Sequence, residues 1–368
     1  MKILVTGAAG FIGSRLAYRL AQRGDEVVGI DNLNTYYDPN LKYARLREFY
    51  GIEPDGQWGM AGAIPETGSD GKTAVVFPDM PYGRVMQSPL MAGLRFMRLD
   101  IVNHDTLNRL FEMEKFDKVM NLAAQAGVRY SLRNPYAYIE SNVMGFMNIL
   151  ECCRLHNIRH LVYASSSSVY GLNDKVPFGE DDEVAQPVSI YAATKKSNEL
   201  MAHAYGKLYG LSTTGLRYFT VYGPWGRPDM APMLFASAIS KGKEINVFNN
   251  GDLIRDFTYV EDIVAGTMQV IDHQPVVPEG GVPAKVYNIG CSHPVKLMDF
   301  IREIEKNLGV EAKKKFMPMQ QGDVYQTNAD TTKLEQEVGY CPSVRLSEGI
   351  ARFIEWYQSG KNPFNQNS

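Results

Sequence analysis

Short apolar runs alternate with amphipathic stretches over the first two hundred residues of the chain. The runs are rich in β-branched and aliphatic residues, as buried strands are, and comprise KILVT (2–6), EVVGI (26–30), LRFMRL (94–99), KVMNLA (118–123) and HLVYAS (160–165). Between most of them the apolar residues recur with a helical period, as in 15–23, 105–113 and 138–156. This alternation predicts an α/β fold in which a doubly wound parallel sheet carries helices on both faces.

Two parts of the chain depart from this pattern. Residues 51–93 contain eight Gly and five Pro without a sustained period, which predicts an insertion before the third strand. Within it, TAVVFP (73–78) is apolar enough to form a strand of its own. Beyond about residue 216 the alternation gives way to mixed segments. We therefore expect a first domain over residues 1–216 and a smaller mixed α/β lobe over 217–368, with some segments of the lobe returning to the first domain.

Composition narrows the possible partners and the compartment. The net charge of −3 and the pI near 6.1 indicate neither a nucleic-acid nor a membrane surface. No stretch approaches 18 uninterrupted apolar residues, and MKILVTGAAG enters a strand directly, unlike a signal peptide. The four cysteines lack C-x-x-C spacing, so reduced thiols in the cytoplasm are expected. The six histidines lack ligand spacing, and no metal is expected.

The segment TGAAGFIG (6–13) joins the first strand to the first helix. Gly7 permits a tight turn, Gly10 lets the backbone approach a pyrophosphate, and Gly13 lets helix and strand pack closely. The helix N-terminus then offers N–H groups and a positive dipole end to the phosphates. Asp31, at the end of the second strand, can accept from ribose hydroxyls and would repel a 2′-phosphate. The motif predicts a Rossmann-type domain that binds NAD rather than NADP.

Other strand ends should border the same crevice. Asp100 closes the third strand, and the turn LAAQAG (122–127) closes the fourth, although either could be an ordinary turn. The residues that we expect to contact NAD are Gly7, Gly10, Phe11, Ile12, Gly13, Asp31, Asn32, Asp100, Ile101, Leu122, Ala123 and Ala124, and the family resemblance given below adds Tyr191, Lys195 and Tyr218.

The segment YAATK places Tyr191 and Lys195 four residues apart at the head of a helical run that extends to Tyr209. Positions i and i+4 share one helix face, so the phenol and the ammonium can meet the same ligand. A free tyrosine titrates near 10, and a nearby lysine with an oxidised nicotinamide would favour the phenolate. The pair is a candidate for general-base catalysis, with an ordinary surface pair as the alternative.

Four consecutive serines, 165–168, follow the apolar run that ends in VYA. The whole sequence, with TGAAGFIG, SSSSVYG, YAATK, RYFTVYGP (217–224) and RDFTYVEDI (255–263), resembles the extended short-chain dehydrogenases/reductases that act on nucleotide sugars. DNLNTYYDPNLKYARL, AAQAGVRYSL, SIYAATKKSNELMAH and FTVYGPWGRPDMA are most similar to the UDP-glucuronate 4-epimerases. The resemblance implies a UDP-sugar substrate, bound NAD that is regenerated in each cycle, and inversion at C4 through a 4-keto intermediate.

The resemblance also implies roles for individual residues. Tyr191 would be the base, Lys195 would hold the nicotinamide ribose, and Ser166 would bond the sugar 4-hydroxyl. Ser167 and Ser168 stand where related dehydratases and decarboxylases carry acidic residues, so this site should oxidise and reduce without eliminating water. The remaining substrate contacts would be Thr220 and Arg227 at the carboxylate, Arg255 at the pyrophosphate, Asp323 at the uridine ribose, and Arg129, which could equally form a structural ion pair.

The sequence predicts a quaternary structure and leaves several alternative functions open. The runs 138–156 and 191–209 resemble helices that form a dimeric four-helix bundle in this family, so a homodimer is expected. A UDP-glucose/galactose 4-epimerase would share every motif without requiring Arg227. A UDP-glucuronate decarboxylase is disfavoured by Ser168. A non-catalytic NAD-binding sensor would not need the intact pair of Tyr191 and Lys195.

Overall fold

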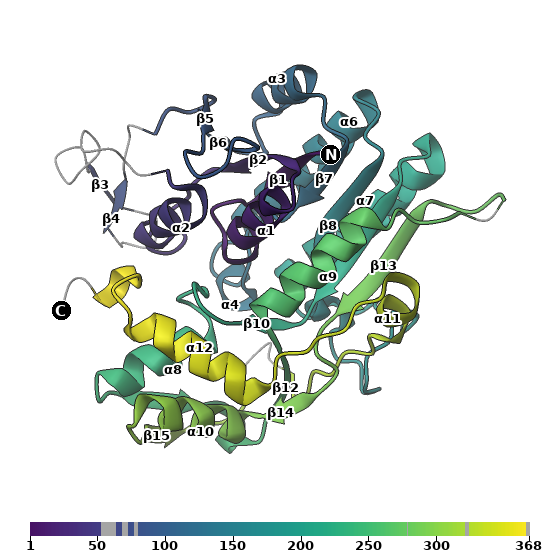
Figure 1. The fold of residues 1–368 in the computed structure, drawn as a ribbon. Coiled ribbons are helices and arrows are strands. Elements are labelled where there is room, and N and C mark those ends of the chain that lie inside the picture. The colour runs from purple at the N-terminus through teal and green to yellow at the C-terminus, as the bar shows by residue number, and fades with distance from the viewer. Residues whose placement is uncertain (53–63, 68–72, 77–79, 278, 321–323, 366–368) are drawn as a thin grey trace.

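The computed structural model describes residues 1–52, 64–67, 73–76, 80–277, 279–320 and 324–365. Its centre is an eight-stranded sheet in the order β13-β9-β8-β7-β1-β2-β6-β5 (Figure 1). The strands are β1 (Lys2–Thr6), β2 (Glu26–Asp31), β5 (Val85–Gln87), β6 (Leu94–Arg98), β7 (Lys118–Asn121), β8 (His160–Ser166), β9 (Thr213–Tyr218) and β13 (Ala284–Ile289). All pairs are parallel except β5 with β6. The predicted doubly wound α/β fold is confirmed.

Both faces of the sheet are buried, which explains its continuous apolar strands. Ile3 and Val5 belong to one hydrophobic cluster and Leu4 to the other, and all three side chains are inaccessible to solvent. The first cluster includes residues of α1 (Phe11–Gln22) and α9 (Val260–Asp272), and the second includes residues of α3 (His104–Glu114), α6 (Gly145–Leu155) and α7 (Ile190–Tyr209). The helices therefore form one layer on each side of the sheet.

The predicted helix over 138–156 is not one regular helix. The segment divides into α5 (Pro135–Tyr138), a π-helical turn η2 (Ile139–Met144) and α6. Within the turn, the Asn142 side chain accepts from the Gln125 backbone N–H at 2.8 Å and donates to Thr194 Oγ1 at 3.0 Å. These two bonds tie the turn after β7 to the first turn of α7, a contact that helical periodicity could not reveal.

The predicted insertion contains more structure than its composition indicated. The strand expected in TAVVFP is present as β4 (Thr73–Val76), which pairs antiparallel with β3 (Ile64–Thr67). Residues 53–63, 68–72 and 77–79 lie outside the described residues. The end of the predicted insertion joins the central sheet, because β5 pairs antiparallel with β6. Three residues are too short a run to be recognised from periodicity.

The smaller lobe lies below the sheet in Figure 1 and packs on it. The sequence boundary at 216 and 217 falls inside β9, and β13 and α9 belong to the central sheet and its layers.

The other elements of the described chain lie partly in the first 216 residues and partly beyond them. The first group comprises α2 (Asn40–Tyr50), α4 (Val128–Ser131) and η3 (Ser167–Tyr170). The second group comprises β10 (Thr220–Tyr222), α8 (Ala231–Ser240), β11 (Glu244–Val247), η4 (Phe248–Gly251), β12 (Ile254–Tyr259), β14 (Pro294–Lys296), α10 (Leu297–Leu308), β15 (Lys313–Phe316), α11 (Thr332–Val338), α12 (Leu346–Gln358) and η5 (Pro363–Asn365).

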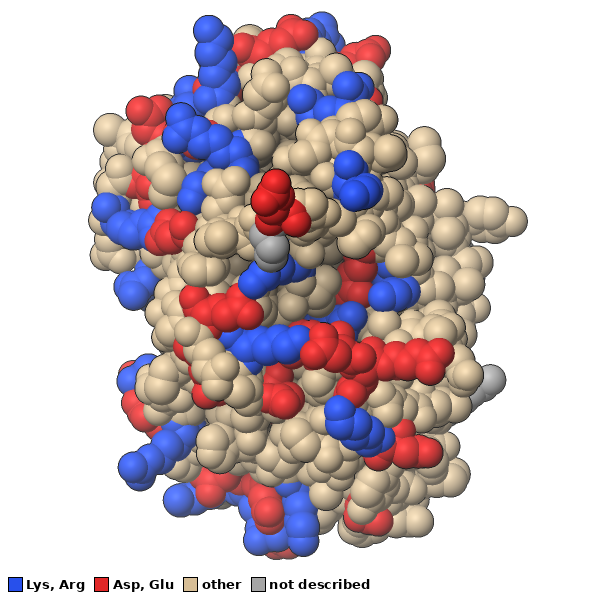
Figure 2. All heavy atoms as spheres, turned by 90° about the vertical axis from the view of Figure 1, so that its right-hand side faces the viewer, with Lys and Arg blue, Asp and Glu red and all other residues tan. Residues whose placement is uncertain are grey.

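The outer surface agrees with the modest net charge. On the face drawn in Figure 2, Lys and Arg side chains lie among Asp and Glu side chains without a broad area of one sign. Within the described ranges, no helix is both long enough and apolar enough to cross a membrane.

Candidate active site

A cavity of about 370 Å³ opens at the carboxyl edge of the parallel strands. In open α/β sheets, ligands bind at this edge, at the point where the strand order changes direction. Here that point lies between the neighbouring strands β1 and β7. The cavity is lined by all the residues expected to contact NAD, together with Ser166, Ser167, Ser168, Thr220 and Arg227. Residues that are distant in sequence therefore meet here as predicted.

Two predicted substrate residues, Arg129 and Arg255, are not brought to this cavity. Arg129 is exposed, and its guanidinium lies 5.4 Å from the ring centroid of Phe248. Arg255 donates to the backbone carbonyls of Val324, at 2.6 Å, and Tyr325, at 2.9 Å. Neither arginine lines the cavity, so their substrate roles remain predictions. Asp323 lies outside the described residues.

The glycine turn forms a close-fitting cradle. Gly7 has a φ of +68°, and a Cβ there would lie 2.9 Å from the Ala123 backbone nitrogen. At Gly13 a Cβ would lie 2.2 Å from the Gly7 carbonyl oxygen, so a side chain is excluded at both positions. No side chain of the described residues caps α1, whose first turn faces the cavity. These features fit the pyrophosphate of a dinucleotide.

Asp31 is fixed beside this cradle. Its carboxylate accepts from the backbone N–H groups of Ala9, at 3.2 Å, and Leu33, at 2.8 Å. Lys42 Nζ lies 3.3 Å from Asp31 Oδ1, a contact that the sequence analysis missed because the spacing of eleven residues matches no helical or strand pattern. The lysine neutralises part of the charge that was expected to repel a 2′-phosphate.

Tyr191 and Lys195 occupy the first turns of α7. Ser189 caps the helix by accepting from the Ala192 N–H at 3.1 Å. Lys195 Nζ donates to the Ala164 carbonyl oxygen at 2.7 Å, and burial lowers the pKa of Lys195 to about 8. Burial raises the pKa of Tyr191, while the Ser166 hydroxyl and the Arg227 charge act to lower it. Arg227, which the sequence analysis placed only at the substrate carboxylate, thus also acts on the Tyr191 phenol.

Three of the four serines line the cavity, and the fourth bonds a residue behind it. Ser166, Ser167 and Ser168 line the cavity, and Ser166 Oγ accepts from the Ser168 backbone N–H at 3.2 Å. The Ser165 hydroxyl instead donates to Glu199 Oε1 at 2.7 Å, behind the strand end. Serine at 165 thus supports the turn, and the other three hydroxyls are available to a ligand.

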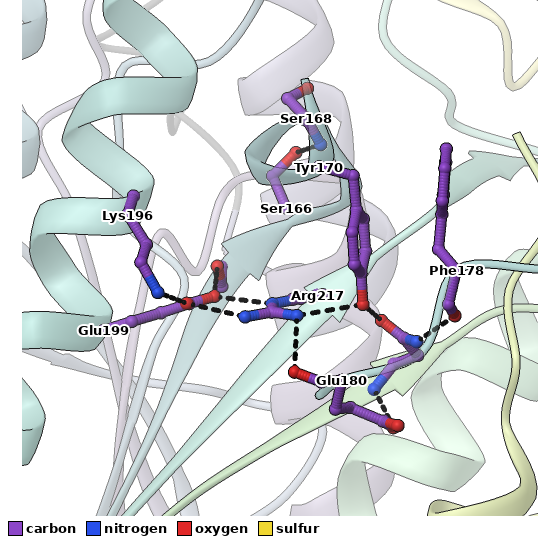
Figure 3. A network of polar contacts seen from close by, with 10 residues as sticks. Ser166, Ser168, Tyr170, Phe178, Glu180, Lys196, Glu199 and Arg217 are labelled. Carbon is purple, nitrogen blue, oxygen red and sulfur yellow. Dashed lines mark hydrogen bonds and ion pairs between the residues drawn. The ribbon is translucent and has the colours of Figure 1, made fainter. Parts of the chain in front are cut away.

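A buried network holds this serine turn from behind (Figure 3). Arg217 on β9 donates to both carboxylate oxygens of Glu199 on α7, at 2.8 and 2.9 Å. Its Nη1 also donates to the Tyr170 hydroxyl at 2.9 Å, and that hydroxyl donates to Asn288 Oδ1 at 2.6 Å. The network therefore connects the η3 turn with β9, β13 and α7.

We predict that Arg217→Met lowers the free energy of unfolding by about 3 kcal/mol, the lower end of the range for breaking a buried pair, because the Glu199 charge loses both Arg217 donors and keeps the partly exposed Lys196 at 3.2 Å. The two side chains of this pair are only 3% and 4% exposed. Urea denaturation measures the change. Arg302→Met is the matched control, since Arg302 pairs with Asp299 at the surface and its loss should cost less than about 1 kcal/mol. Equal effects of the two substitutions would show that the buried network does not stabilise the turn.

Arg227 forms an ion pair that the sequence analysis did not foresee. Its Nε and Nη2 donate to the two Asp229 oxygens at 3.0 and 2.5 Å, and Tyr36 donates its hydroxyl to Asp229 Oδ2 at 2.9 Å. Tyr36 and Asp229 are separated by 193 residues. Both lie within motifs that carried the family resemblance, but no spacing rule indicates that they meet.

Residues 3–290 match the model of the NAD dependent epimerase/dehydratase family, which is more than half of the chain. The chain belongs to this family. UDP-glucuronate 4-epimerase 4 of Arabidopsis thaliana is 44% identical over 368 aligned residues, which cover 97% of this chain and 75% of that protein.

Solved structures agree with the family and the fold. UDP-glucuronic acid 4-epimerase from Bacillus cereus, in complex with UDP-glucuronic acid and NAD, has a TM-score of 0.80 at 32% identity, covering 97% of this chain and 98% of that chain. UDP-glucose 4-epimerase from Thermotoga maritima, solved with UDP-glucose, has a TM-score of 0.77 at 26% identity, covering 97% and 99%. The fold is common to both activities, so specificity has to be argued from the site.

Proposed function

We propose that the protein interconverts UDP-glucuronate and UDP-galacturonate by inverting C4 through a transient 4-keto sugar, with NAD bound throughout. The observation that carries this proposal is the position of Arg227 in the same cavity as Tyr191, close enough for its charge to favour the phenolate. A cation for the sugar carboxylate thus lies beside the candidate base. The similarity to UDP-glucuronate 4-epimerases over nearly the whole chain supports the same substrate.

The chemistry divides between the cofactor and the chain. The glycine turn and Asp31 would hold NAD, which would supply reversible hydride exchange with C4. The Tyr191 phenolate removes the proton of the 4-hydroxyl, and Ser166 orients that hydroxyl. After the keto sugar has turned over, Tyr191 returns the proton to the oxygen. No net oxidation occurs, and the protein's task is to keep substrate and intermediate in one pocket.

A uronate adds a hazard, because a ketone at C4 and a carboxylate on C5 form a β-keto acid that loses CO₂ readily. Ser167 and Ser168 line the cavity and provide no carboxyl group to protonate a carbanion or a leaving group. We propose that Arg227 and Thr220 hold the substrate carboxylate away from the alignment that favours cleavage. This arrangement favours epimerisation over decarboxylation.

Incubation with UDP-glucuronate, UDP-glucose and UDP-xylose, followed by chromatography of the products, tests the proposal. We expect UDP-galacturonate as the main product and little UDP-pentose. Main activity on UDP-glucose would identify a neutral-sugar epimerase instead. A dominant UDP-pentose product would identify a decarboxylase, and absence of turnover with all three would support a sensor.

Tyr191→Phe should abolish turnover, because the ring remains while the acid–base group is lost. The purified variant should still carry NAD, since the glycine turn and Asp31 are unchanged. Product assays and the cofactor content of the denatured protein measure the two effects. Activity above a few per cent of the wild type would mean that another group is the base.

Arg227→Ala should reduce kcat/KM for UDP-glucuronate by about 10- to 150-fold, the range expected for one hydrogen bond to an ionised group. Any UDP-glucose reaction should fall less, because it loses the effect of the Arg227 charge on Tyr191 but no carboxylate contact. More of the keto intermediate should lose CO₂. Arg227→Lys should restore activity only in part, because an ammonium lacks the fork of donors. A fall of the same size on both sugars would refute carboxylate recognition at this position.

We propose a homodimer formed by α6 and α7 with the turns around them. These neighbouring elements leave large apolar side chains in solvent, among them Tyr136, Met144, Leu200 and Leu208, the last two being 61% and 69% exposed. The resemblance of both runs to the helices of a dimeric bundle supports the same assembly here.

Leu200→Glu should convert the dimer into a monomer, because the charge would be buried without a partner in the interface. Sedimentation equilibrium measures the mass. Val276→Glu is the control, since Val276 is 80% exposed in the loop after α9 and its substitution should leave the dimer intact. A wild-type protein that sediments as a monomer would overturn the proposal.

We also propose a cytoplasmic location. All four cysteines are free, and Cys152 and Cys153 are fully buried, which supports a reducing compartment.

A further inference from the structure

The ion pair of Arg227 and Asp229 is asymmetric with respect to the cavity. Arg227 lines the cavity, whereas Asp229 does not. The carboxylate therefore approaches the guanidinium from behind. Although burial opposes their ionisation, each partner stabilises the other's charge, so the pKa of Arg227 is raised and the pKa of Asp229 is lowered.

The contact uses one particular edge of the guanidinium. Asp229 accepts from Nε and Nη2, at 3.0 and 2.5 Å, which is the side-on edge. A guanidinium carries five N–H donors in a rigid plane, so Asp229 does not use Nη1 or the second proton of Nη2. Those donors form the end-on edge, which can take a second carboxylate in a two-pronged contact.

Tyr36 holds Asp229 in this orientation. The Tyr36 hydroxyl donates to Asp229 Oδ2 at 2.9 Å, and the Tyr36 ring packs on Tyr130 with centroids 4.8 Å apart. Burial raises the pKa of Tyr36, so the hydroxyl keeps its proton and remains a donor. The loop that follows β2 thus reaches across the site to fix a residue of the loop that follows β10.

Gly127 shows how closely these side chains converge. Its φ is +101°, and a Cβ at this position would lie 2.7 Å from the Tyr36 hydroxyl and 3.3 Å from Arg227 Nη2. Backbone and side chains therefore pack around the pair, which restricts rotation of the guanidinium about its long axis.

We propose that Asp229, held by Tyr36, is a positioning residue that aims the end-on edge of Arg227 at the substrate, and that selection of a sugar carboxylate depends on this pair. The inference rests on the proposed function only in its choice of a uronate as the ligand. It makes both residues determinants of specificity: Asp229 acts through Arg227 from outside the cavity lining, and Tyr36, which lines the cavity, acts by holding Asp229.

The test compares the binding of UDP-glucuronate and UDP-glucose by titration calorimetry with the purified, cofactor-loaded protein. Asp229→Asn keeps the shape but turns an N–H₂ group toward an arginine donor, so Arg227 loses its fixed orientation. We expect the affinity for UDP-glucuronate to fall by about 10- to 100-fold and that for UDP-glucose to change less than about threefold. Tyr36→Phe should shift the same preference in the same direction by about fivefold, the value of a single hydrogen bond.

Tyr130→Phe is the matched control. It keeps the ring against Tyr36 and removes a hydroxyl that accepts only from Asn134 at 3.2 Å among the hydrogen bonds of the described residues. Its sugar preference should equal that of the wild type.

Two results would overturn the inference. A tighter affinity for UDP-glucuronate in Asp229→Asn would show that Asp229 competes with the substrate carboxylate for Arg227. Equal losses for both sugars would assign Asp229 a purely structural role. Binding does not require turnover, so a failure of the proposed C4 inversion would appear in the product assay while the preference for a carboxylate could still be measured.

Discussion

Parallel pairing of β1, β7, β8 and β9 is the constraint on which the site depends. It brings the ends of these strands to one edge, at Thr6, Asn121, Ser166 and Tyr218. The Thr6 hydroxyl donates to Asn121 Oδ1 at 2.7 Å and accepts from the Ala123 N–H at 2.9 Å, so the glycine turn and the turn after β7 are fixed to each other. A change in strand order would separate the candidate cofactor and substrate residues.

Three cations near this edge are compensated differently, and the difference fits the role of each. Arg217 on β9 is held by the Glu199 carboxylate on α7 and by the Tyr170 hydroxyl on η3, and it serves as a rigid support (Figure 3). Among the described residues, the Lys195 ammonium donates to one partner, the Ala164 carbonyl oxygen, and burial lowers its pKa to about 8. Arg227 is paired on one edge, which leaves its other donors to the cavity. Groups placed in this way need little reorganisation when a charged substrate enters.

Local sequence patterns predicted most of the fold and the centre of the site. The strands and the turn at Gly7 were predictable because burial on both faces of the sheet and close backbone approach restrict residue types directly. The pair of Tyr191 and Lys195 was predictable because one helix face brings them together. The roles given to Arg129 and Arg255 stay predictions, since local sequence does not determine where a long side chain points. The contact of Tyr36 with Asp229 depends on two loops brought together by the whole fold, and no pattern in one sequence records it.

Family membership and site geometry together describe an enzyme that oxidises and reduces the same carbon without releasing its intermediate. The most direct test uses UDP-glucuronate deuterated at C4, incubated with the protein and added unlabelled NADH. The account predicts that UDP-galacturonate retains the deuterium at C4, because the hydride returns within one pocket. Loss of most of the deuterium to free cofactor, or a product whose configuration at C4 is not inverted, would contradict the account.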